Sequence, residues 1–258
     1  MPQPVYPPTG PQSIGQVLDL AFRIFQISLL PCLLYGVAST IAGQLPNIYF
    51  VASGRPLQAL GGRSPLWWAL YCAGALVALL MSAALQLRQR TIATGRPVSA
   101  RAEIAEAMRR LPALVLMFIV LLIAIGVGML ALVIPGIYLM TALVLAWPAL
   151  LFGGKGPLQA LGYSLRLVVG NWWRTTTIFT IALVIVLVFY GIATAVMVPF
   201  VGAIDIATLT AFSAVVYVAL GAIGLPFLSA IVVASYGELQ VRKEGADLEQ
   251  RIASVAPS

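Results

Sequence analysis

Few side chains in this chain are of the types that carry out chemistry. The sequence contains no histidine, and its two cysteines, Cys32 and Cys72, both lie in apolar stretches. Two isolated thiols make neither a metal site nor a disulfide framework. There is no Gly-rich phosphate-binding loop, and serines such as Ser164 have no basic partner of the kind that activates a nucleophile. We therefore expect no catalytic residue, no metal site, no cofactor and no enzymatic activity.

The polar residues with a suggestive spacing are basic and aromatic, and they lie at the edges of apolar stretches. In segment 153–174, Gln159 and Arg166 interrupt an otherwise apolar segment of helical period. The run 170–174 (GNWWR) has the composition of a water–lipid boundary. Each basic group near an anionic leaflet contributes about 1 kcal/mol to lipid binding, although such charges also serve simply to set membrane orientation. The candidate anionic-lipid or interface contacts are Arg23, Arg109, Arg110, Arg166, Asn171, Trp172, Trp173 and Arg174.

The composition of the chain indicates that lipid surrounds much of it. Of 258 residues, 61% are hydrophobic and 9% are charged, and the mean hydropathy is +1.00. A soluble domain is about half apolar and about a quarter charged. The net charge of +7 would suit a nucleic-acid-binding protein, but the basic residues lie in short connections between apolar stretches. We therefore expect a membrane protein without a nucleic-acid partner.

The apolar stretches are long enough for six membrane-spanning helices. This predicts an all-α, polytopic helical bundle with amphipathic interfacial helices beside the spans. We expect the membrane domain to cover 13–240, after a disordered Pro-rich tail at 1–12 and before a cytoplasmic tail at 241–258. The predicted spans are about 29–45, 65–87, 112–134, 137–152, 175–200 and 207–236.

Two features at or inside these spans leave alternatives, and a third indicates a local bend. Segment 14–27 carries its polar residues on one stripe, so it is either an interfacial helix or the start of the first span. Pro135 and Gly136 suit a tight turn between the third and fourth spans, or else a kink in one continuous helix. We favour the turn, because about forty apolar residues exceed one bilayer crossing. Gly221, Gly224 and Pro226 would allow a kink and a close helix approach inside the sixth span.

Basic residues are distributed unevenly between the two sides of this topology. With six spans both termini share one side, and of the 15 Lys and Arg residues only Arg55 and Arg63 fall on the other. The positive-inside rule therefore predicts that both termini and the polar helices are cytoplasmic.

A polar helix followed by a hairpin of two spans occurs three times in the predicted topology. Gln16 and Arg23 align with Gln159 and Arg166 in one register, and Arg109 aligns with Arg23 in another. The matching residues are few and of common types, so either chance or a three-fold internal repeat accounts for them. A real repeat would place three polar helices as a basic collar around the bundle.

Several motifs resemble those of a bacterial membrane-protein family. They are IPGIY at 134–138, WPA at 147–149, GPLQAL at 156–161, GNWWR at 170–174 and VRKEGADLE at 241–249. The chain is similar to the membrane domain attached to some glycerophosphodiester phosphodiesterases, and to the largely uncharacterised stand-alone six-span relatives of that domain. Members often have an acidic residue near the end of the fourth span, where this chain has Gly153 and Gly154. The resemblance implies a bacterial inner-membrane protein, but not phosphodiesterase activity, because the soluble catalytic domain is missing.

These features together predict a membrane scaffold or lipid-interacting protein whose basic cytoplasmic face engages membrane lipids, anionic phospholipids in particular. A homo-oligomer or a membrane-protein partner would also fit that face. The alternative function is that of a permease-like protein for a lipophilic or small substrate. All charged residues fall outside the predicted span centres, which argues against proton or sodium coupling.

Overall fold

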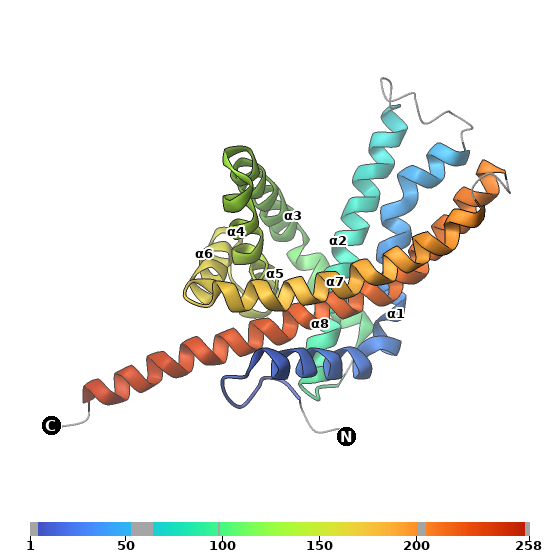
Figure 1. Cartoon of the computed structure of the whole chain (residues 1–258). Helices are drawn as coiled ribbons and strands as arrows, with labels where there is room; N and C mark the ends of the chain where they lie inside the picture. Colours follow the sequence, from blue (N-terminus) through green and yellow to red (C-terminus); the bar gives the residue numbers. More distant parts are fainter. Residues whose placement is uncertain (1–4, 53–63, 98, 201–204, 256–258) are drawn as a thin grey trace.

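The computed structural model of the chain describes residues 5–52, 64–97, 99–200 and 205–255. These residues form helices and connections, with no β-strand among them (Figure 1). The helices are α1 (Ile14–Ala52), α2 (Pro65–Ala93), α3 (Ala100–Ala131), α4 (Val133–Leu143), α5 (Ala146–Gly153), α6 (Pro157–Val168), α7 (Trp172–Met197), the short 3-10 helix η1 (Val198–Phe200) and α8 (Ile206–Val255).

Six segments of the described chain are long and apolar enough to cross a membrane, so this is a multi-pass membrane protein. They are Ile14–Tyr49, Pro65–Ala93, Ala100–Leu130, Ile134–Gly153, Trp172–Met197 and Ala211–Gly245. Each overlaps one of the six apolar stretches that the sequence predicts, but their ends differ and several helices extend well beyond those stretches. The predicted tail at 241–258, for example, continues α8 as far as Val255. Hydropathy marks where a helix lies in lipid, whereas backbone hydrogen bonding continues after the helix has left it.

The first half of α1 lies across the lower end of the bundle, and its second half runs upward beside α2 (Figure 1). Pro31 lies inside this helix, where it removes a backbone donor and allows the axis to bend. Val17 and Ile24 are buried, whereas Asp19 and Arg23 are exposed. Segment 14–27 is therefore an amphipathic helix with one buried face, and its backbone is continuous with the first span.

The predicted hairpin of the third and fourth spans is present, but Pro135 and Gly136 do not form its turn. The chain reverses at Leu132, whose backbone is extended at φ −168°, and both residues lie in the first turn of α4. Proline is tolerated there because the backbone amides of a first turn have no helical partner. Gly136 instead lets α4 approach α3, since a Cβ on it would lie 3.0 Å from Cα of Met129. The predicted turn was wrong because a Pro-Gly pair suits a helix start as well as a β-turn.

Close backbone contacts join α1 to both α2 and α8. A Cβ on Gly74 of α2 would overlap the carbonyl oxygen of Ala42, and one on Gly36 would lie 2.7 Å from a carbonyl oxygen of α8. Small residues allow such approaches, which matter in lipid because apolar contact alone does not drive helix association there. Gly224, by contrast, has open space beside it, and α8 continues through Pro226 without interruption. The close approach predicted inside the sixth span is made instead at Gly221, where a Cβ would lie 2.8 Å from Cγ2 of Thr40 in α1.

The three polar helices of the predicted repeat are not equivalent in the structure. Segments 14–27 and 100–111 continue directly into the spans of α1 and α3, whereas α6 is separated from α7. The separating turn contains Gly170 at φ +86°, a conformation that favours glycine. A common evolutionary origin of the three units stays a prediction.

Candidate functional site

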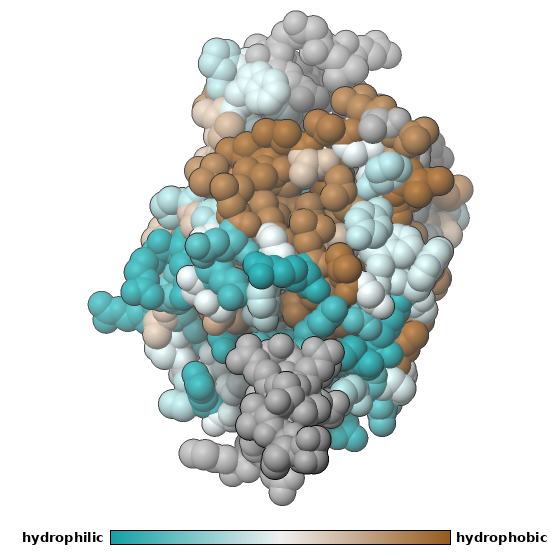
Figure 2. All heavy atoms as spheres, turned by 90° about the vertical axis from the view of Figure 1, so that its left-hand side faces the viewer, coloured by the Kyte–Doolittle hydropathy of each residue, from teal (hydrophilic) through white to brown (hydrophobic). Residues whose placement is uncertain are grey.

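The basic residues gather at one end of the bundle, which we call the basic end. It comprises the first half of α1, the connection from α2 to α3, the region of α5 and α6, and the C-terminal half of α8 (Figure 1). Figure 2 shows hydrophilic residues grouped there, below a broad hydrophobic surface. Among the described residues, no group of His, Cys, Asp and Glu side chains could hold a metal ion. The chemistry available at this end is therefore that of arginine and aromatic side chains.

The buried carboxylate of Glu238 in α8 holds two arginines. Its Oε1 lies 2.6 Å from Nη2 of Arg242 and 3.3 Å from Nη2 of Arg174, and Glu238 is 1% exposed. Both arginines also donate to the backbone carbonyl of Gln12. This network joins α7, α8 and the segment before α1, so Arg174, a predicted lipid contact, has its charge paired within the protein. The spacing of four residues between Glu238 and Arg242 was the available sequence signal.

A second buried carboxylate, that of Glu103, joins the first three helices. Its Oε2 lies 2.9 Å from Nη1 of Arg88 and accepts a hydrogen bond from the Tyr35 hydroxyl at 3.3 Å. The other oxygen of Glu103 and the Nε of Arg88 are buried without a partner among the described residues. Ordered water is the usual partner of such atoms. Because a buried pair loses about 3–5 kcal/mol when one partner is removed, this cluster stabilises the contact of α1, α2 and α3.

Two further arginines bind carbonyl groups near the end of α5. Arg110 pairs with Glu106 and donates to the carbonyl of Leu150. Arg90 donates to the carbonyl of Phe152 at 3.4 Å and lies over the ring of that residue, 4.7 Å from its centroid. Cations are favoured at a helix C-terminus, where backbone carbonyls lack partners. Arg110, a predicted lipid contact, is thus also committed to the protein.

The remaining arginines of the basic end point outward. Arg109 pairs with Glu106, yet its side chain is 74% exposed. Among the described residues, the Arg166 side chain hydrogen bonds only to a carbonyl of its own helix, at 3.4 Å. The arginines that are exposed and have no acidic partner among the described residues are Arg23, Arg96, Arg101 and Arg166. Of the predicted basic contacts, Arg23 and Arg166 therefore have their charge available to the surroundings, whereas the exposed Arg109 is paired with Glu106.

The two tryptophans of the GNWWR run at 170–174, which we call the aromatic corner, differ in exposure. Trp173 is 77% exposed, whereas Trp172 lies against Tyr138 with ring centroids 5.5 Å apart. Asn171 occupies the N-cap position without a side-chain cap bond, and its carbonyl accepts from the Thr175 hydroxyl. Trp173 is the member of this corner placed to enter a headgroup region, where tryptophan is enriched.

Residues 5–12 lie against the basic end as an N-terminal strap, so the predicted disorder was wrong for them; residues 1–4 lie outside the described part. The amides of Val5 and Tyr6 donate to the carbonyl of Ala93, at the end of α2, at 3.0 and 3.2 Å. The Tyr6 ring is 6% exposed and fits against Gly237, where a Cβ would lie 2.9 Å from Cζ. Burial raises the pKa of Tyr6 from 10.0 to about 12. Proline content indicates an extended backbone but says nothing about what that backbone contacts.

Comparisons of the chain with protein-family models, with curated proteins and with solved structures give no match. The resemblance to the membrane domain of glycerophosphodiester phosphodiesterases therefore stays a prediction. The function has to be argued from the geometry of the basic end.

Proposed function

We propose that this chain is a non-enzymatic protein of the bacterial inner membrane that binds anionic phospholipid headgroups at its basic end. The supporting observation is that the arginines of this end differ in whether an acidic side chain neutralises their charge. Some arginines pair with Glu103, Glu106 or Glu238 and hold helices together. They are Arg88, Arg110, Arg174 and Arg242. Other arginines are exposed and have no acidic partner among the described residues, so their charge is available to a ligand. They are Arg23, Arg96, Arg101 and Arg166.

Arginine suits this role because its planar guanidinium forms paired hydrogen bonds with phosphate oxygens. The exposed arginines belong to the basic end, and Figure 2 shows the hydrophilic residues of that end next to the broad hydrophobic surface. Lipid phosphates occupy the corresponding level of a bilayer. Each basic group contributes about 1 kcal/mol, so neutralising three of them should weaken the binding of anionic lipid by roughly 3 kcal/mol, or about 100-fold.

Native mass spectrometry of the detergent-purified protein tests this proposal. The protein is mixed with phosphatidylglycerol or phosphatidylcholine, and retained lipid is counted for the wild type and for an Arg23→Gln/Arg101→Gln/Arg166→Gln variant. We expect the variant to lose phosphatidylglycerol and to keep its weak retention of phosphatidylcholine.

The matched control is Arg55→Gln/Arg63→Gln, which removes basic residues predicted to face the other side of the membrane. An unchanged thermal midpoint shows that each variant is folded. Equal retention of phosphatidylglycerol by the triple variant and the wild type would overturn the proposal. It would also be overturned if the control variant lost as much phosphatidylglycerol as the triple variant does.

The proposal includes cytoplasmic termini, which accessibility labelling tests. In a Cys72→Ser background, an impermeant maleimide should modify Arg55→Cys in intact cells and Lys155→Cys only in inverted membrane vesicles. Labelling of both positions from one side contradicts this orientation. The alternative function, a permease for a lipophilic or small substrate, would show as uptake into proteoliposomes above that of empty vesicles.

A further inference from the structure

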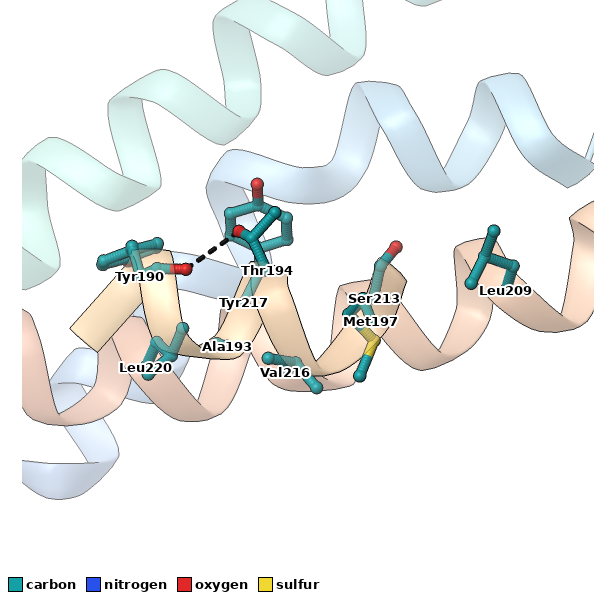
Figure 3. Close-up of a pocket in the computed structure, with 9 residues that line it drawn as sticks. All are labelled: Tyr190, Ala193, Thr194, Met197, Leu209, Ser213, Val216, Tyr217 and Leu220. Atoms are coloured by element: carbon teal, nitrogen blue, oxygen red, sulfur yellow. Dashed lines mark hydrogen bonds between the residues drawn. The ribbon is translucent and has the colours of Figure 1, made fainter. Parts of the chain in front are cut away.

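A pocket of about 280 Å³ lies between the second half of α7 and the first half of α8 (Figure 3). None of the described residues that line it is charged. Figure 3 shows the hydroxyl groups of Thr194, Ser213 and Tyr217 on one side. The opposite side is formed by apolar side chains such as Met197 and Val216. The pocket is thus amphipathic but uncharged, unlike the basic end.

Two phenol groups define the polar side of this pocket. The rings of Tyr190 and Tyr217 lie 5.9 Å apart, one from each helix. Neither hydroxyl has a hydrogen-bond partner among the described residues, whereas the Thr194 hydroxyl already donates to the carbonyl of Tyr190 at 2.8 Å. A polar group without a partner is costly in a bilayer, because hydrocarbon supplies no acceptor. Two donors on adjacent helices therefore indicate a ligand that brings acceptors with it.

The position of the pocket restricts the source of that ligand. Tyr190 follows Trp172, the first residue of α7, by five turns of helix, which is about 27 Å at 1.5 Å per residue. The pocket therefore lies toward the end of the bundle opposite the basic end, inside two membrane-spanning segments. Tyr217 is 46% exposed on the outer surface, so the pocket opens toward lipid rather than toward the protein interior.

We propose that this pocket binds the ester region of a glycerolipid from the leaflet opposite the basic end. The tyrosine hydroxyls donate to an ester carbonyl, and the adjoining acyl segment lies against Met197, Leu209 and Val216. The volume is at the lower limit for small-molecule sites, so it holds one part of a lipid rather than a whole molecule. The uncharged lining makes binding independent of headgroup charge. This site is therefore separate from the proposed headgroup surface.

Photo-crosslinking in phosphatidylcholine proteoliposomes tests the proposal. The vesicles contain a trace of phosphatidylcholine with a diazirine on its chain, linked to glycerol either by an ester or by an ether, which lacks the carbonyl. We expect the ester lipid to label peptides of α7 and α8 at the pocket more than the ether lipid does, by roughly two- to tenfold per hydrogen bond. The difference should disappear in Tyr190→Phe/Tyr217→Phe, which keeps both rings.

Two further variants complete the experiment. Tyr71→Phe removes an exposed tyrosine hydroxyl elsewhere in the spans and should keep the ester preference. Ala193→Trp fills the pocket and should reduce labelling by both lipids. Equal labelling by ester and ether lipids in the wild type would overturn the proposal, and so would an ester preference that survives the double Phe variant. Phosphatidylcholine is zwitterionic, so failure here leaves anionic-lipid binding at the basic end untouched.

Discussion

Replacing Gly237 by alanine would put a methyl group into the space that the Tyr6 ring occupies. The new Cβ would lie 2.9 Å from Cζ and 3.0 Å from Oη of Tyr6, whereas atoms in contact normally lie about 3.5–4.0 Å apart. The ring has little room to move, because the amides of Val5 and Tyr6 are bonded to the carbonyl of Ala93. Overpacking of this kind costs about 1–3 kcal/mol. We therefore expect docking of the strap to weaken by roughly 5- to 150-fold.

Hydrogen exchange of the Val5 and Tyr6 amides measures this weakening, and both should exchange faster by that factor. A global unfolding experiment would obscure the effect, because alanine stabilises a helix interior by about 0.5–1 kcal/mol relative to glycine. Gly224→Ala is the matched control: it lies in the same helix with open space beside it, and should leave the exchange unchanged. In a Tyr6→Ala background, Gly237→Ala should add no further increase. Unchanged exchange in Gly237→Ala alone would refute the packing of the Tyr6 ring against Gly237.

Three further predictions concern stability and pH. Gly74→Ala should destabilise the protein by about 1–3 kcal/mol in reversible unfolding in mixed micelles, since its methyl would meet the α1 backbone; Gly43→Ala, with open space beside it, should not. Glu238→Gln should cost about 3–5 kcal/mol in the same assay, because two arginines lose a buried carboxylate; an unchanged midpoint would contradict this. Because the pKa of Tyr6 is raised to about 12, its contribution to docking is full below pH 10 and is lost as the pH rises to 12. A spin label on Thr9→Cys should become mobile over that range, but stay immobile in a Tyr6→Phe background.

The division of the chain into membrane spans could be predicted because it depends on local properties. Length and hydropathy decide whether a stretch can cross a bilayer, and each of the six predicted stretches overlaps a long apolar helical segment. Helix ends were less predictable. The reversal at Leu132 has no turn signature of its own, and the strong Pro135-Gly136 signal beside it belongs to a helix start.

What the sequence by itself determined is that this chain crosses the membrane and carries its basic residues beside the spans. Only the tertiary structure decided which of those residues are free. In the sequence Arg166 and Arg174 are both basic residues beside an apolar span, yet Arg166 is exposed and Arg174 is held by Glu238, 64 residues further along the chain. The strap likewise depends on Gly237 lying beside Tyr6. Such partners are brought together by helix packing, and no local pattern of residues specifies which helices lie side by side.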